Sequence, residues 1–161
     1  MSYEQLDRWI DAHFDEEVRF LQELVRVPTD TPPGDNAPHA ERTAELLAAM
    51  GLPAEKHPVP AQAVHDYGLQ SITNLIVRRP YSAAGPTIAL NAHGDVVPPG
   101  DGWTHGPYSG EVVDGKLYGR ASAVSKSDFA SFTFARRAPE SLGTPWKGGG
   151  ELHCSDDANI G

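Results

Sequence analysis

Apolar residues recur at helical spacing along the first part of the chain. Ser2 and Gln5 precede this pattern with the spacing of a helix capping box, and Pro28 follows it. The pattern predicts an amphipathic helix over residues 2–25 whose apolar stripe lies in the core. The stripe comprises Leu6, Trp9, Ile10, Phe14, Val18, Leu21, Leu24 and Val25.

A second helix is predicted between two residues that typically mark helix ends. Pro38 fits the first turn of a helix, and Gly51 supplies a stop signal after it. Ala40, Ala44 and Leu47 recur at the spacing of a buried face. We expect His39, which precedes this face, to be exposed.

Four segments have the composition of strands. Residues 53–60, with proline at both ends, predict a short edge strand. Residues 87–90 form a continuous apolar run with β-branched content, which is typical of a buried strand. We expect this run to pair with the strand predicted at residues 74–77. A further short strand is expected within residues 148–157.

A hairpin and a third helix are predicted between residues 112 and 140. Asp114 and Gly115 form a typical two-residue hairpin turn between Val112 and Arg120. Phe129, Phe132, Thr133 and Ala135 have helical spacing, and Pro139 is expected to end that helix.

Composition and charge exclude several classes of protein. The chain has 161 residues and 39% apolar content, which suits one globular domain. With 13 basic and 22 acidic residues, and no basic stripe, it lacks the positive surface with which proteins bind nucleic acid or an anionic membrane, and we expect neither as a partner. The single Cys154 excludes an internal disulfide, and neither a membrane-length apolar run nor a signal peptide is visible. A soluble cytoplasmic protein is expected.

Chemistry-bearing residues follow the apolar run at 87–90. His93 and Asp95 come at the carboxyl end of that strand, where open α/β sheets bind ligands. Residues two apart on an extended backbone share a face, so both side chains should point into one pocket. Two interpretations remain open for this pair alone: a metal-binding His with an orienting carboxylate, or a strand-end His bonded to a loop Asp.

Residues 88–120 resemble one family of enzymes. The shared pattern is an apolar strand, H-x-D-V-V-P, a tryptophan, a P-Y-x-G turn and D-G-K-L-Y-G-R. It is similar to the dinuclear zinc amidohydrolases that include glutamate carboxypeptidase, succinyl-diaminopimelate desuccinylase, acetylornithine deacetylase and aminoacylase. The resemblance implies an α/β fold with a mixed sheet flanked by helices, a zinc-exopeptidase-like α/β/α sandwich that is incomplete here. It also implies that His93 binds metal and that Asp95 acts in catalysis by orienting the site.

The sequence departs from the family pattern after Arg120. The position of the family's metal-bridging Asp is Val124, which has no lone pair to offer. Asp128 is either a replacement metal ligand or a first-turn acid that complements the helix dipole, and the second interpretation is favoured. Near the end, one register aligns Asp156 with the family's catalytic base and Asp157 with a metal ligand. The ungapped register places Ala158 and Asn159 there instead and removes the base.

Two functional hypotheses follow from this resemblance. In the first, residues 1–161 are the amino-terminal portion of a metallohydrolase catalytic domain, without its lid and dimerisation domain. Such an enzyme would hydrolyse amide bonds in small peptides or N-acyl amino acids with zinc, or with cobalt or manganese, and would be impaired or inactive as a truncated chain. In the second, the chain is a non-catalytic scaffold for binding or assembly. Either way an uncovered sheet edge or face is expected, and with it a possible homodimer.

Overall fold

The computed structural model describes residues 2–82 and 85–156, in which helices and strands alternate along much of the chain. The helices are α1 (Tyr3–Val25), α2 (Ala37–Ala49), α3 (Ala61–Asp66) and α4 (Lys126–Ser141). The strands are β1 (Glu55–Pro58), β2 (Thr73–Pro80), β3 (Thr87–His93), β4 (Glu111–Val113), β5 (Lys116–Tyr118) and β6 (Gly149–Ser155).

The main sheet has the order β1-β2-β6-β3. β2 pairs antiparallel with both β1 and β6, whereas β3 pairs parallel with β6. This mixed sheet with its helices confirms the predicted fold class. The expected pairing of residues 74–77 with 87–90 is wrong, because β6, the last strand in the sequence, lies between β2 and β3.

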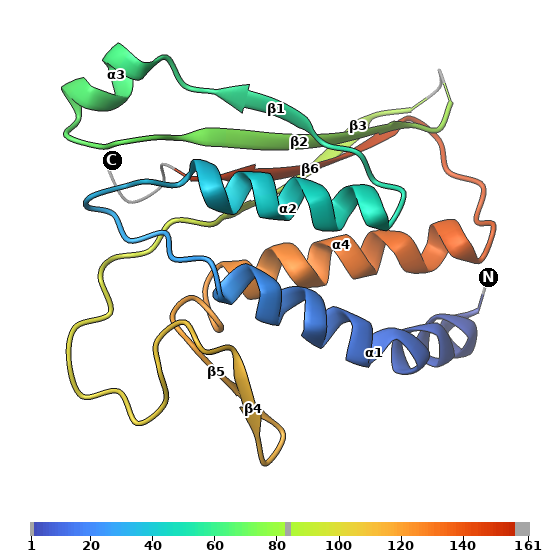
Figure 1. Cartoon of the computed structure of the whole chain (residues 1–161). Coiled ribbons are helices and arrows are strands. Elements are labelled where there is room, and N and C mark those ends of the chain that lie inside the picture. Colours follow the sequence, from blue (N-terminus) through green and yellow to red (C-terminus); the bar gives the residue numbers. More distant parts are fainter. Residues whose placement is uncertain (1, 83–84, 157–161) are drawn as a thin grey trace.

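Helices α1, α2 and α4 form two layers on one side of the sheet, whereas α3 lies beyond the end of β1 and β2 (Figure 1). α2 packs against β1 and β2, α4 packs against β3 and β6, and α1 packs against α4 and α2. None of the described helices combines the length and apolar character that a membrane span requires.

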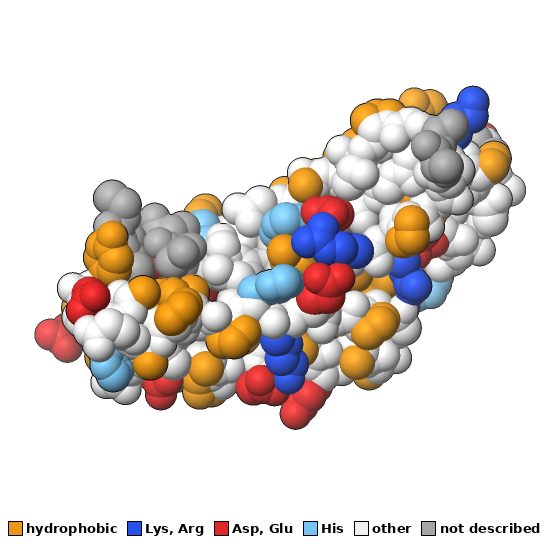
Figure 2. Space-filling model, turned by 90° about the horizontal axis from the view of Figure 1, so that it is seen from above, with side chains coloured by type: hydrophobic (Ala, Val, Ile, Leu, Met, Phe, Trp, Pro, Cys, Tyr) orange, Lys and Arg blue, Asp and Glu red, His pale blue; other side chains and the backbone are white. Residues whose placement is uncertain are grey.

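The opposite side of the sheet carries charged side chains. Viewed from above, basic, acidic and histidine side chains lie together near the centre of the molecule (Figure 2). Arg78 of β2 forms ion pairs with Glu55 of β1 and Glu151 of β6, and Glu151 also contacts His153 at 2.7 Å. Strand alternation places His153 on this charged face, opposite to Leu152 and Cys154.

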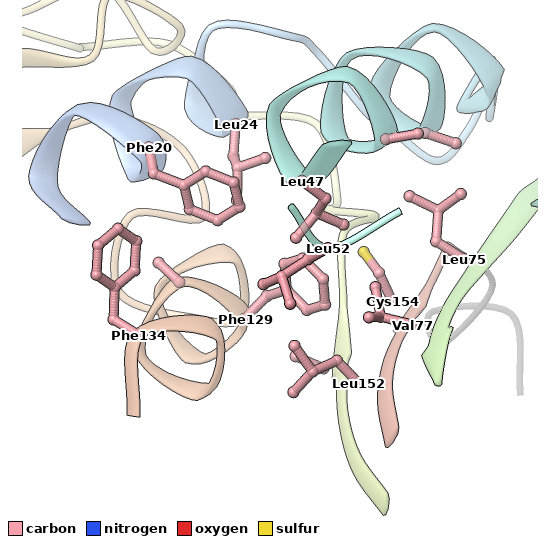
Figure 3. Close-up of a cluster of buried hydrophobic side chains, with 14 residues drawn as sticks. Phe20, Leu24, Leu47, Leu52, Leu75, Val77, Phe129, Phe134, Leu152 and Cys154 are labelled. Carbon is pink, nitrogen blue, oxygen red and sulfur yellow. The ribbon is translucent and has the colours of Figure 1, made fainter. Parts of the chain in front are cut away.

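The core lies between the sheet and the helices (Figure 3). Side chains from every layer meet there: Phe20, Leu24, Leu47, Leu52, Leu75, Val77, Phe129, Phe134, Leu152 and Cys154. The predicted stripe of α1 is only partly correct, since Ile10 is 41% and Phe14 57% exposed. α1 lies in the outer layer, where neighbouring helices bury a narrower stripe than a sheet would.

Three expectations about β3 and α4 need correction. β3 is not buried: it lies at the edge of the described sheet, and Ile88 is 60% exposed. Ala135 is exposed, whereas Phe134 takes the inner position on α4. The helix also continues past Pro139 to Ser141, because a proline in the last turn removes few backbone hydrogen bonds.

The hairpin and the first helix start as predicted. β4 and β5 pair across Asp114 and Gly115, whose φ angles of 49° and 74° are both positive, as a tight hairpin turn requires. Ser2 and Gln5 form the reciprocal hydrogen bonds of a capping box at the start of α1.

Candidate metal centre

A cavity of about 400 Å³ opens beside the carboxyl end of β3. Its position agrees with the rule that ligands bind beyond the carboxyl ends of strands in α/β sheets. The lining comes from the end of β3, the loop that follows it and the segment before α4: His93, Asp95, Val96, Val97, Trp103, Gly119, Arg120, Ala121, Ser122, Ala123 and Val124.

His93 and Asp95 lie together in this cavity. The Nδ1 atom of His93 is 3.0 Å from the Asp95 carbonyl oxygen and 3.3 Å from the Asp95 carboxylate. A carbonyl oxygen and an ionised carboxylate accept hydrogen bonds and cannot donate them. The His93 Nδ1 atom therefore carries the proton and donates it. The lone pair of the neutral ring is then on Nε2, which is the arrangement of a metal-binding histidine oriented by a carboxylate.

The loop that carries this pair is fixed from two sides. Gly94 donates its N–H to the carbonyl of Ser155 at 2.8 Å and accepts a hydrogen bond from the Thr29 hydroxyl at 2.6 Å. Val96 donates to the carbonyl of Thr29 at 3.0 Å. The geometry of His93 and Asp95 is therefore held by backbone contacts from β6 and from the loop after α1.

Gly94 separates the cavity from a buried polar cluster beneath it. A Cβ atom at this position would lie 2.2 Å from Asp156 Oδ1 and 2.6 Å from His39 Cε1, so only glycine fits. His39 is 1% exposed, and our expectation that it is exposed was wrong. His39, Thr43 and Leu47 follow at four-residue intervals and form the buried face of α2 with its alanines, a spacing that could have indicated the burial.

Lys126 is a second buried residue that sequence reasoning did not place. Its ammonium donates to the carbonyls of Leu24 at 3.0 Å and Val27 at 2.9 Å, which joins the start of α4 to the end of α1. Burial lowers the pKa of Lys126 to about 8, although nearby acids, Asp156 foremost, oppose this shift.

The remaining predicted ligands do not gather around His93 in the described residues. Asp128 is exposed and accepts a hydrogen bond from Ser125 at 2.9 Å in the first turn of α4, and it does not line the cavity. Asp156 is buried beneath Gly94 and faces His39. Asp157 lies outside the described residues.

Val124 occupies the cavity wall where the family resemblance expects a bridging carboxylate. Its side chain is 64% exposed and offers no donor atom. Within residues 2–82 and 85–156, the lining supplies one imidazole and one carboxylate that is already tied to it. These residues supply one metal ligand, which by itself does not make a site for two ions.

Comparisons with known proteins agree with the geometry. Residues 89–148 match the model of Peptidase family M20/M25/M40. The succinyl-diaminopimelate desuccinylase of Methylorubrum populi is 41% identical over 109 residues, which are 66% of this chain and 26% of that protein. The desuccinylase of Xanthobacter autotrophicus is 36% identical over 128 residues, which are 78% of this chain and 31% of that protein. The chain thus spans less than a third of these relatives.

Solved structures share the fold. The di-peptidase Dug1p of Saccharomyces cerevisiae superposes with a TM-score of 0.79 at 16% identity, over 98% of this chain and 35% of that protein. Human carnosine dipeptidase 1 superposes with a TM-score of 0.74 at 24% identity, over the same shares of the two chains. The chain is therefore similar to Peptidase family M20/M25/M40 over residues 89–148 and to these desuccinylases over part of their length, and it shares the fold of the two dipeptidases.

Proposed function

We propose that the chain is part of a metal-dependent hydrolase of amide bonds in small peptides or N-acyl amino acids. The observation that carries this proposal is the pair of His93 and Asp95 at the carboxyl end of β3. Their contacts leave the Nε2 lone pair of His93 available in a cavity of about 400 Å³. Similarity to this peptidase family over residues 89–148 supports use of a divalent metal.

The proposed substrate class comes from the relatives and agrees with the cavity. The relatives are named as a desuccinylase of succinyl-diaminopimelate and as dipeptidases, so their substrates are amides that carry carboxylates. Arg120 lines the cavity, and its Nε donates to the carbonyl of Val97 at 2.9 Å. A guanidinium fixed at this place supplies positive charge for a substrate carboxylate.

Each residue of the pair has a separate part in this proposal. His93 would hold the metal through Nε2, and Asp95 would keep the ring in that tautomer and orientation. A divalent metal bound there would supply Lewis-acid polarisation of the scissile carbonyl and activation of water. Asp128 and Asp157 as further ligands and Asp156 as a base stay predictions, as do the identity and number of ions. The homodimer and the cytoplasmic location stay predictions too.

A second candidate function rests on Val124. Because this valine stands in the cavity wall without a lone pair, the chain also fits a scaffold that retains the fold and lacks the chemistry. The two candidates differ in whether the cavity turns over a substrate.

The experiment is a hydrolysis assay with the 161-residue chain and zinc, cobalt or manganese. Suitable substrates are N-succinyl-diaminopimelate and a panel of dipeptides, with release of succinate or free amino acid as the readout. We expect slow metal-dependent hydrolysis that is lost in His93→Ala and greatly reduced in Asp95→Asn. His65→Ala is the matched control, because His65 is an exposed residue of α3 away from the cavity lining.

The same assay decides between the two candidates. Val124→Asp places a carboxylate in the cavity wall and should raise the rate if the cavity is catalytic. No hydrolysis above the uncatalysed rate with any of the three metals, in either the natural chain or Val124→Asp, would contradict the hydrolase proposal and favour the scaffold.

A further inference from the structure

Three potential metal ligands meet on the core side of the sheet, beneath Gly94. They are His39 from the first turn of α2, Cys154 near the end of β6 and Asp156 just after it. One ligand atom from each residue lies within 4.8 Å of the corresponding atoms of the other two. The three residues are 1%, 3% and 1% exposed, respectively.

Local structure explains why these side chains converge. Cys154 and Asp156 are two positions apart at the end of an extended strand, so both project to the same face. The start of α2 is held over that face, because the Asn36 side-chain amide donates to the backbone carbonyl of Asp156 at 3.0 Å. His39 is on the first turn of the same helix and points at the pair.

Three polar atoms of this cluster have no hydrogen-bond partner among the residues that the structure describes. They are both ring nitrogens of His39 and the Oδ1 atom of Asp156. The shortest contact, from His39 Nδ1 to Asp156 Oδ1, is 3.6 Å, which exceeds a normal hydrogen bond. Buried groups are nearly always paired, and leaving such a group without a partner costs about 1–3 kcal/mol. The donor atoms are thus arranged for a ligand that would satisfy several of them at once.

A plain hydrogen-bonded pair of His39 and Asp156 accounts for only part of the cluster. A small movement would close the contact between Nδ1 and Oδ1. It would still leave Nε2 without a partner in the described part of the chain. It also gives no role to Cys154, whose sulfur lies within 4.8 Å of a ligand atom of each of the other two residues. A metal ion between the three side chains accounts for all of them.

We propose that His39, Cys154 and Asp156 form a buried site for a zinc-like divalent metal, separate from the His93 cavity. Nitrogen, sulfur and carboxylate oxygen are the ligands that zinc takes in proteins, at distances that put neighbouring ligand atoms about 3.5 Å apart in a tetrahedron. The cluster needs to contract only slightly to reach that spacing. Three protein ligands leave one position for water.

The charges around the cluster allow a cation there. Among residues 2–82 and 85–156, the charged groups near it besides its own ligands are the Lys126 ammonium from α4 and the Asp95 carboxylate from the loop after β3. Binding converts the Cys154 thiol to a thiolate and releases its proton to solvent. The charges of the ion, the Cys154 thiolate, the carboxylates of Asp95 and Asp156 and the Lys126 ammonium sum to zero, so these described groups bury no net charge. The bound metal would join α2 to the end of β6 and hold Asp156 against Gly94.

Cobalt titration of the metal-stripped 161-residue chain tests this site. Cobalt replaces zinc in such sites and gives a near-ultraviolet charge-transfer band only with a thiolate ligand. Because Cys154 is the only cysteine in the sequence, the band identifies the site without any substitution. We expect a band that saturates at one equivalent of cobalt and disappears on addition of zinc. The band should be absent in Cys154→Ser. In His39→Gln, the affinity for cobalt should be at least tenfold weaker.

His93→Ala separates this proposal from the hydrolase proposal. That variant should keep the thiolate band while losing hydrolysis. Absence of the band from the natural chain would overturn the inference, as would a band that depends on His93 or survives His39→Gln at full affinity. Circular dichroism of each metal-free variant establishes that it is folded, and the result from the natural chain stands even if a variant is not.

Discussion

Gly94 is the residue on which the candidate site depends most directly. It lies between His93 and Asp95, and its missing side chain allows the loop to lie against His39 and Asp156. We predict that Gly94→Ala destabilises the fold by about 1–3 kcal/mol, the usual cost of forcing extra volume into a packed interior. Urea denaturation measures the change.

Gly106→Ala is the matched control for that substitution. The nearest atom to a Cβ at Gly106 is 3.7 Å away, which is ordinary contact, and its backbone conformation is open to any residue. Its stability should change by less than about 0.5 kcal/mol. Equal effects of the two substitutions would show that the close approach at Gly94 has no energetic consequence.

Lys126 should make stability depend on pH above neutrality. Its pKa is about 8 in the folded chain and 10.5 as its ordinary value, so between these limits the unfolded chain binds more protons. Stability therefore rises with pH in this window, by about 1 kcal/mol from pH 7 to pH 9. Burial also raises the pKa of Cys154, which opposes the rise as pH 9 is approached.

Lys126→Met isolates the contribution of the ammonium group. Urea denaturation at pH 7, 8 and 9 should show the rise in the natural chain and its loss in the variant, because the Cys154 effect is common to both. A natural chain whose stability does not rise relative to Lys126→Met would contradict the prediction, whatever the absolute stability of the variant.

Single residues were predictable from sequence where they belong to a local motif. The pattern around His93 and Asp95 placed both in one cavity, because strand alternation and the strand end are local properties. The contacts of Gly94 with His39 and Asp156 join residues far apart in the chain. No spacing in the sequence indicates such a contact, and the burial of Lys126 escaped prediction for the same reason.

At the scale of elements, α1 shows how a correct helix can have a partly wrong face. Phe14 and Phe20 both fall in its sequence, yet Phe14 is 57% exposed and Phe20 is 4% exposed, between Phe129 and Phe134. We predict that Phe20→Ala lowers the free energy of unfolding by about 3–5 kcal/mol and that Phe14→Ala lowers it by less than about 0.5 kcal/mol. Thermal and urea unfolding measure both, and similar losses would place Phe14 in the core after all.

The elements themselves followed from sequence better than their arrangement did. The capping box of α1, the proline near the start of α2 and the turn of the β4–β5 hairpin are local signals, and the structure contains all three. The order of strands is a long-range property. β6 pairs with two strands that come much earlier in the chain, and nothing in its sequence indicates that it lies between them.

At the scale of the molecule, the described part of the chain is a sheet with one covered side. Helices pack on one face, and the other carries the ion pairs of Arg78 with Glu55 and Glu151 (Figures 1 and 2). These charged side chains make that uncovered face suited to contact with water. The free edge at β3 differs, since Ile88 and the nearby Trp146 are both exposed and line a small apolar pocket with Leu90.

This edge leads to a prediction about association. An unpaired strand presents a row of free N–H and C=O groups that another strand can pair with, and exposed apolar side chains favour such pairing. We predict that the purified chain associates at high concentration through β3 and that Ile88→Lys weakens the association at least tenfold. Sedimentation velocity over a range of concentrations measures it.

Val113→Lys, in the exposed β4 strand, is the control and should leave association unchanged. Association that is equally strong in both variants, or a monomer at every concentration, would mean that the edge of β3 is not the contact.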